Sequence, residues 1–235
     1  MTSKEIVAQL SKMGSATIKN VFMKHGAPEP LYGVKVGDLK TIEKKVKRNH
    51  ELALELFDTG NSDAMYLAGL ISEPKKMTKK QLEDWAEKAT WYMLSEFAVA
   101  WSAAESPFAL ELAQKWIKSK KEMIACTGWA TYSNYIALTP DADLDKKELE
   151  SLLYSIGKDI HKAPNRVRHC MNNFVISVGG YVSSLTDHAK KTAKSYGVVT
   201  VDMGDTACKV PEAISYMDKM IARGSHTKKK KTVKC

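Results

Sequence analysis

The sequence predicts an all-α protein in which antiparallel helix pairs stack into a curved array, a solenoid. Nearly every segment repeats its apolar residues with helical period, and the predicted helices of roughly 10–18 residues are joined by short turns. The β-like stretches, 31–36 and 198–203, are too few for a sheet and predict at most a small hairpin or cap. Because no repeat of fixed period is present, a compact irregular bundle is the alternative arrangement.

The helix predicted over residues 36–47 has two distinct faces. Its apolar face carries Val36, Leu39, Ile42 and Val46, and a second face carries Lys40, Lys44 and Lys47. With Lys45 and Arg48 these lysines form a basic run that could follow a phosphate backbone. A charge run on a helix is more often simply a solvated face, so the pattern does not decide between the two.

Start and stop signals place the later helices. A capping box at Thr78–Gln81 opens the helix that contains Trp85, and Ser106-Pro107 marks the start of the next. Asp145 with Glu148 caps the helix that follows, and the helix starting near Thr186 ends at Gly197.

Composition predicts one helical-repeat domain over residues 1–222 and a basic, flexible C-terminal tail over 223–235. The chain has 235 residues, 44% of them hydrophobic, and a net charge of +9. The tail holds six basic residues and no acidic one, so the body has 30 basic and 27 acidic residues, a net charge of only +3. The tail can be read as a nucleic-acid arm or as a solvated terminus, and the sequence favours neither.

Cellular context follows from what the chain lacks. The four cysteines are scattered without a C-x-x-C pair, which predicts free thiols and no zinc site. The first residues begin an amphipathic helix rather than a signal peptide, and no apolar run approaches the roughly 20 residues of a membrane span. We therefore expect a cytoplasmic protein that needs no metal or organic cofactor and has no membrane partner.

The segment Trp91–Ala104 departs from plain amphipathic packing. Only Ser95, Glu96 and Ser102 are polar in it, so the helix should be buried nearly all round. A buried carboxylate must be paired or must line a cavity. Tyr92 lies one turn before Glu96, which allows an acid beside an aromatic wall, as a cation-stabilising site needs. The alternative is a structural ion pair with a lysine or arginine of the next helix.

The helix predicted from Pro164 to about Val178 has an apolar stripe on one side and an unusual polar side. The polar side carries Arg166, Arg168, His169, Asn172 and Asn173. Two adjacent asparagines are poor helix formers and suggest a surface selected for hydrogen bonds to phosphate or sugar. Lys162, just before this helix, extends the predicted DNA-binding set. His169 has no partner at metal-ligand spacing.

The chain resembles the AlkD-like DNA alkylation repair family in the order and spacing of four segments. These are residues 31–48, 89–101, 112–133 and 166–182. The resemblance implies an ARM/HEAT-type superhelix of HEAT-like helix pairs. It also implies the activity of the family's glycosylases, which excise positively charged N-alkylated purines while holding duplex DNA in a basic concave groove.

Carried over by this resemblance, the acid that stabilises the developing sugar cation is Glu96, where the glycosylases have Asp, and the cleft aromatic is Tyr92 in place of Trp. Two positions depart from the glycosylase pattern. A second cleft tryptophan corresponds to Asn173, and a cleft arginine corresponds to Cys126. Loss of an aromatic wall and of a phosphate-binding cation should weaken the grip on a lesion.

Three functions are compatible with these residues. The first is a DNA-binding repair protein that hydrolyses the N-glycosidic bond of alkylated purines, a DNA-3-methyladenine/7-methylguanine glycosylase with Glu96 and Tyr92 as its catalytic pair. The second is a non-catalytic binder of damaged, bent or branched DNA, recognised by shape and charge. The third is a helical-repeat scaffold for protein partners. Both DNA functions require the basic residues to converge on one face.

Overall fold

A computed structural model describes residues 1–234, and this part of the chain is helical with no β-strand. The elements are α1 (Ser3–Met13), α2 (Ala16–Lys24), α3 (Val36–Val46), α4 (His50–Asp58), α5 (Ser62–Ile71), η1 (Pro74–Lys76), α6 (Lys79–Lys88), η2 (Met93–Val99), α7 (Ala100–Ala104), α8 (Ala109–Trp116), α9 (Glu122–Leu138), η3 (Asp141–Asp143), α10 (Lys146–Asp159), η4 (Ile160–Lys162), α11 (Asn165–Tyr181), η5 (Ser183–Leu185), α12 (Thr186–Tyr196) and α13 (Ala213–Ala222).

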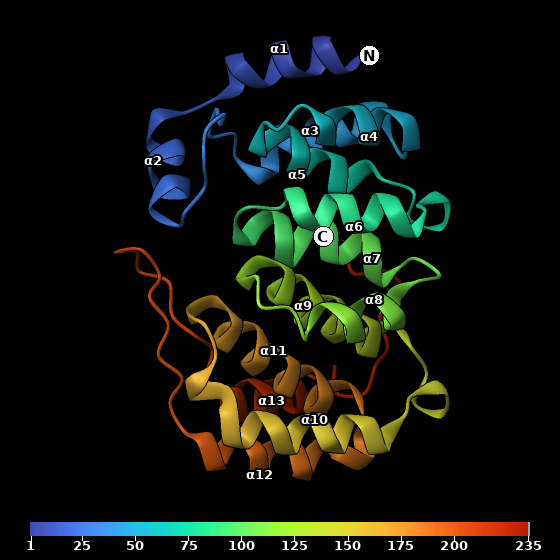
Figure 1. The fold of residues 1–235 in the computed structure, drawn as a ribbon, viewed down its shortest axis with the longest axis vertical. Helices are drawn as coiled ribbons and strands as arrows, with labels where there is room; N and C mark the ends of the chain where they lie inside the picture. The colour runs from blue at the N-terminus through green and yellow to red at the C-terminus, as the bar shows by residue number, and fades with distance from the viewer. Residues whose placement is uncertain (235) are drawn as a thin grey trace.

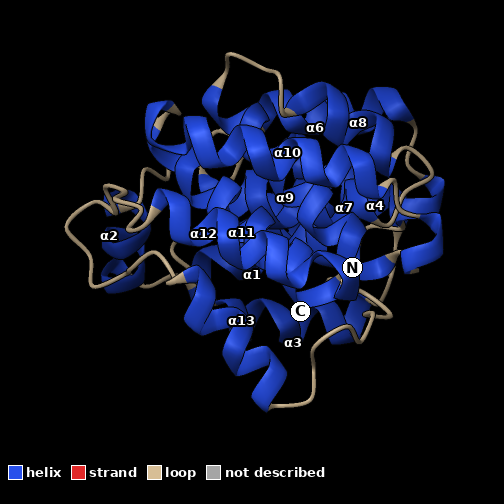
Figure 2. Cartoon of the chain, turned by 90° about the horizontal axis from the view of Figure 1, so that it is seen from below, coloured by secondary structure: helices blue, strands red, loops and turns tan. Residues whose placement is uncertain are grey.

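The helices stack along the long axis of the molecule, with α1 at one end, α5 to α9 in the middle, and α10 and α12 at the other end (Figure 1). Consecutive helices pack as antiparallel pairs, such as α4 with α5 and α8 with α9. Viewed along the axis, α6, α8 and α10 lie on one side and α1, α3 and α13 on the opposite side, with α9 and α11 between them (Figure 2). The predicted curved array of helix pairs is confirmed.

An inner layer of helices forms the spine of the array. It consists of α5, the continuous η2–α7 segment, α9 and α11, each packed on the next. All ten residues of α5 are buried, as the apolar character of its sequence requires. Gly69 allows α5 to approach η2 closely, because a Cβ there would lie 2.5 Å from the Cα of Ala98.

The capping residues predicted two helix starts correctly and one slightly too early. The Thr78 side chain and Gln81 form the predicted capping box, and the Asp145 side chain accepts a hydrogen bond from the N–H of Glu148. The helix after Ser106-Pro107 begins slightly later than predicted, at Ala109, because Ser106 instead caps a turn by accepting the N–H of Phe108.

The segment expected to be a flexible tail packs along the body instead. We call residues 225–234 the C-terminal strap; Cys235 lies outside the described residues. Thr227 donates its N–H to Gly180 O at the end of α11, and Lys230 donates its N–H to Ala137 O in the last turn of α9. Further along, Glu105 after α7 accepts the N–H of Val233 at 2.9 Å. The strap thus crosses the C-terminal ends of the inner helices.

Lysine side chains explain why this strap is basic. The ammonium of Lys229 donates to Ile136 O at 2.9 Å and also pairs with Asp141. The ammonium of Lys234 is buried and donates to the carbonyl and hydroxyl oxygens of Ser72, the C-cap of α5. The C-terminal end of a helix leaves carbonyls that need hydrogen-bond donors, and both lysines supply them; at Lys229 the positive charge also meets the partial negative charge of the helix end. Part of the strap's charge is therefore structural, a role that composition alone could not reveal.

The two β-like stretches form no strand. Residues 31–36 lead into α3, and the N–H groups of Tyr32, Gly33 and Val34 donate to the carboxylate of Asp63 rather than to a second strand. Residues 198–212 form a long loop that reaches the N-terminal part of the array, where Gly204 with a φ of +66° lies against Lys24 O. No helix in residues 1–234 is long and apolar enough to cross a membrane.

Candidate functional site

Glu96 and Arg166, predicted to act separately, form a buried ion pair. Glu96 projects from η2 and Arg166 from the first turn of α11, 70 residues later. The Nε of Arg166 donates to Oε1 of Glu96, and Nη2 donates to Oε2 at 3.1 Å. The side chains are only 13% and 5% exposed for Arg166 and Glu96, respectively. Both oxygens of the predicted catalytic carboxylate are thus occupied by the residue predicted to contact phosphate.

The surroundings keep Glu96 ionised. Burial by itself would raise the pKa of Glu96, but hydrogen bonds from His169 and Arg166 outweigh it, and the pKa is lowered from its ordinary value. Burial likewise opposes the charge of Arg166, yet the neighbouring Glu96 raises its pKa overall. The pair is therefore an ion pair at neutral pH, with the positive and negative charges balanced locally.

The Arg166 guanidinium also covers the face of Tyr92, the aromatic residue predicted to line the cleft. Its guanidinium carbon lies 4.2 Å from the centroid of the Tyr92 ring, a cation–π contact. Tyr92 and Arg166 line a cleft of about 270 Å³ at the N-terminal ends of η2, α9 and α11. Across the cleft, His25 packs edge-on against Tyr92, and the sulfur of Met203 lies 3.3 Å from Nη1 of Arg166. One side chain thus covers both Glu96 and the face of Tyr92.

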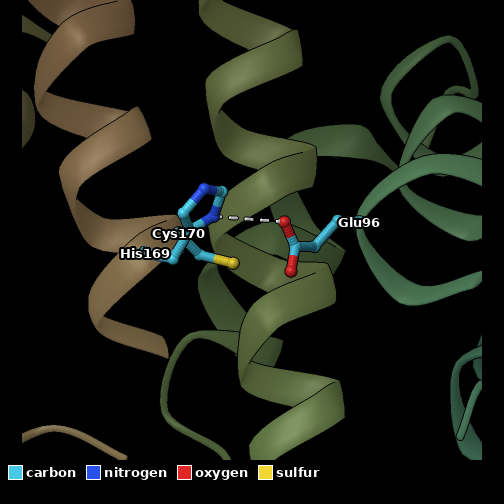
Figure 3. A group of neighbouring side chains, drawn as sticks. All are labelled: Glu96, His169 and Cys170. Carbon is cyan, nitrogen blue, oxygen red and sulfur yellow. Dashed lines mark ion pairs between the residues drawn. The ribbon is translucent and has the colours of Figure 1, made fainter. Parts of the chain in front are cut away.

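Glu96, His169 and Cys170 form a cluster of three groups that can ligate metals (Figure 3). Their donor atoms all lie within 4.8 Å of one another, and Nδ1 of His169 is 3.5 Å from Oε2 of Glu96. Sequence spacing gave no sign of this cluster, because its members come from two helices. An ion here would have to displace the Arg166 guanidinium from Glu96, so the donor set does not fit a metal while that ion pair is in place.

A second, smaller cavity of about 190 Å³ opens beside this cluster. It is lined by Glu96, His169, Cys170 and Asn173 among others. Asn173 lies within hydrogen-bonding distance of His169, with Nδ2 at 3.3 Å from Nδ1. Cys126 is fully buried on α9. The two positions that depart from the glycosylase pattern therefore hold an amide that lines the smaller cavity and a thiol that is fully buried.

Two residues predicted to contact DNA have structural roles. Asn172 is buried: its amide donates to Pro211 O at 2.9 Å and its oxygen accepts from the Tyr196 hydroxyl. Arg168, about one turn earlier on the same helix, donates to the carbonyls of Ala163 and Thr200. The pair of asparagines suggested one exposed polar face, but successive helix positions are 100° apart, and only Asn173 is partly exposed.

The basic residues predicted on α3 also differ in their roles, because Arg48 makes structural hydrogen bonds and the lysines do not. Arg48 donates from Nη1 to Leu70 O and Ser72 O, and so serves the C-terminal end of α5. Lys40, Lys44 and Lys47 make no ion pair among residues 1–234 and are at least partly exposed. Lys162 is exposed and pairs only with Asp159, three residues before it. These four lysines retain charge that a ligand can use.

The predicted basic residues lie at different places on the inner layer. Arg166 is in the first turn of α11, whereas Arg48 lies at the C-terminal end of α5, next to the strap. The strap meets α11 at Gly180, roughly 20 Å along the helix from Arg166. Arg48 and Arg166 therefore do not converge on one face as predicted, and only Arg166 lines the cleft beside Tyr92.

Sequence reasoning missed the loop 198–212 and α2 as parts of the cleft. Asn165 holds this loop, donating its amide to Asp202 O at 3.0 Å and accepting the N–H of Asp202 at 2.8 Å. His25 lies 3.7 Å from the sulfur of Cys208. The available signal was the run of extended-type residues after Gly197, which predicted a cap but not its position.

Comparisons with known proteins agree with the resemblance. A family described as DNA alkylation repair enzyme matches residues 6–217. Uncharacterized proteins of Listeria innocua serovar 6a and Listeria monocytogenes serovar 1/2a are each 38% identical over 225 residues, 93% of this chain and 97% of each relative. A solved structure is 35% identical with a TM-score of 0.89 and full coverage of both chains. It is described as a new family of proteins related to the HEAT-like repeat DNA glycosylases with affinity for branched DNA structures.

Proposed function

The chain belongs to the DNA alkylation repair family, and we propose that within this family it binds branched or distorted DNA without hydrolysing the N-glycosidic bond of alkylated purines. The observation that carries the proposal is the bidentate pairing of Glu96 with Arg166. Affinity for branched DNA in a similar solved structure supports the choice of ligand.

The ion pair removes what base excision needs from a carboxylate. In a glycosidic cleavage the acid stabilises positive charge that develops on the sugar. The charge of Glu96 is already balanced by Arg166, and both its oxygens accept hydrogen bonds. A sugar cation would have to displace the guanidinium, and breaking a buried pair costs about 3–5 kcal/mol. A cost of that size slows a reaction by two orders of magnitude or more.

Free lysines supply the charge for binding. Three lysines lie in α3 or directly after it, namely Lys40, Lys44 and Lys47. None of them is neutralised by an ion pair in the described part of the chain. Each phosphate that such a lysine neutralises releases a counterion and makes binding dependent on salt. We propose these three residues, with Lys162 and Asn173, as contacts to the DNA backbone.

Fluorescence anisotropy tests the binding part of the proposal. We expect the protein to bind a four-way junction more tightly than a linear duplex of equal length, with affinity that falls steeply as salt rises. A K40Q/K44Q/K47Q variant should flatten the slope of log K against log salt by about 2.7, or 0.9 for each contact. A matched variant, K147Q/K191Q/K194Q, removes the same charge from exposed positions on α10 and α12 and should leave the slope unchanged.

Base release tests the catalytic part. We expect no release of N7-methylguanine or N3-methyladenine from duplex DNA by the wild-type protein. Release that disappears in E96Q would make this a glycosylase and refute the proposal. Failure to bind any DNA in a salt-dependent way would refute it too, and would favour a scaffold for protein partners.

A further inference from the structure

The C-terminal strap forms one wall of a groove that the function above does not use. The groove has a volume of about 770 Å³ and runs between the strap, the turn after α5 and the C-terminal ends of α7 and α9. Lys230 and Lys231 line it from the strap, Lys75 and Lys76 from the turn, and Arg48 from the end of α3. We call it the strap groove.

The strap groove is strongly positive. Five cations and two carboxylates, Glu73 and Glu105, line it, for a net charge of +3. Both carboxylates are already engaged. Glu73 pairs with Lys76 at 3.0 Å, and Glu105 accepts hydrogen bonds from Thr232 and Val233 of the strap. Neither carboxylate therefore pairs with Lys75, Lys230 or Lys231.

These three lysines are uncommitted, yet two of them are held in place. Lys75 and Lys231 make no ion pair or hydrogen bond through their side chains within residues 1–234, and the ammonium of Lys230 contacts only the Tyr181 ring, at 5.9 Å. The strap backbone is fixed on either side by Thr227 and Val233, and at Lys230 itself. A ligand would thus meet charges whose main chain is already ordered, which lowers the entropic cost of binding.

An aromatic side chain completes the groove. Tyr135 of α9 is partly exposed and lines the groove together with the apolar side chains of Leu138 and Pro74. Cations that follow a backbone, next to an aromatic ring on which a base can stack, are the pattern by which proteins bind single-stranded nucleic acid. A groove of this volume has the size of a small-ligand site, which suits a short stretch of single strand rather than a duplex.

We propose that the strap groove binds a single-stranded arm of branched DNA, with phosphates on Lys75, Lys230 and Lys231 and a base on Tyr135. This inference rests on the proposed DNA binding and assigns it a second contact surface. The groove lies at the C-terminal ends of the inner helices, whereas the cleft lined by Tyr92 and Arg166 lies at their N-terminal ends. A branched substrate can reach both places with different arms.

Three DNA substrates with the same duplex sequence test the inference by fluorescence anisotropy: a blunt duplex, a fork with two single-stranded thymine arms, and a four-way junction with duplex arms only. We expect the wild-type protein to bind the fork more tightly than the blunt duplex. A K75Q/K230Q/K231Q variant should lose that advantage, and its salt slope on the fork should fall by about 2, or 0.7 for each contact to single strands. The K147Q/K191Q/K194Q variant is the charge-matched control.

Substitution of Tyr135 separates stacking from charge. Y135L should weaken fork binding by roughly tenfold while the salt slope stays unchanged, because a ring contributes stacking and no charge. Far-UV circular dichroism confirms that each variant folds before it is compared.

The outcomes distinguish the two proposals. If the wild-type protein binds none of the three substrates, the proposed function itself fails. If it binds the junction but prefers the fork no more than the duplex, or if the groove variant matches the control variant, the single-strand inference is overturned. Equal loss of junction and fork binding in the groove variant would also overturn it, because the groove would then hold a duplex arm.

Discussion

Replacing Glu96 by Gln tests whether the carboxylate is truly locked to Arg166. The change removes one charge from a pair in which the Glu96 side chain is 5% exposed and the Arg166 side chain 13% exposed. Removal of one partner from a buried ion pair leaves an uncompensated charge and costs about 3–5 kcal/mol. Because the amide oxygen of Gln can still accept a hydrogen bond from Arg166, we expect the lower end, about 3 kcal/mol of unfolding free energy.

The loss should show in thermal and pH dependence. At roughly 2–4 °C per kcal/mol for a chain of this size, the midpoint of unfolding should fall by roughly 6–12 °C at pH 7. The folded-state pKa of Glu96 lies below its ordinary value of 4.5, so the ionised form contributes stability at and above that pH. The difference between wild type and E96Q should therefore persist from pH 5 to 8 and shrink as the pH falls through the lowered pKa.

Urea unfolding followed by tryptophan fluorescence measures this difference. A double-mutant cycle with R166Q isolates the pair, and we expect the double variant to be more stable than the sum of the two single losses predicts. K121Q serves as the control, because the Lys121–Glu87 pair is 69% and 54% exposed and should contribute less than about 1 kcal/mol. A loss below about 0.5 kcal/mol in E96Q would refute the reasoning, since such a carboxylate is uncoupled from Arg166 and free for catalysis.

Three further substitutions test structural assignments. N172L leaves the Tyr196 hydroxyl and a backbone carbonyl without partners, so urea unfolding should show a loss of about 1–3 kcal/mol; weaker DNA binding at unchanged stability would instead restore its role as a DNA contact. Burial lowers the pKa of Lys234 from 10.5 to about 7, so the unfolded chain keeps this proton to a higher pH than the folded chain does. The free energy of unfolding of the wild type should therefore rise relative to that of K234M between about pH 7 and 9. A constant difference between the two proteins would contradict this burial. G69A places a methyl group 2.5 Å from the Ala98 Cα and should cost about 1–3 kcal/mol in the same assay, whereas a neutral effect would show that α5 and η2 pack less closely.

The sequence alone determined the helical architecture, because its signals are local. Apolar period and capping residues act within a few positions, as at Thr78 and Asp145, so they can be read without knowledge of the rest of the chain. The burial of Glu96 was also predicted, because an almost wholly apolar helix has no solvent face. The need for a charged partner followed from the cost of burying a carboxylate.

Only the tertiary structure decided which residue is the charged partner of Glu96. Arg166 lies 70 positions away and reaches Glu96 from the first turn of α11, a partnership that no periodicity encodes. The same holds for the strap, where lysines that looked like a free arm meet the carbonyls of helices that end far away in sequence. Charge patterns indicate which residues need partners, but the pairing depends on which helix ends the stack brings together. The pairing of Glu96 with Arg166 is the observation on which the proposal of DNA binding without base excision rests.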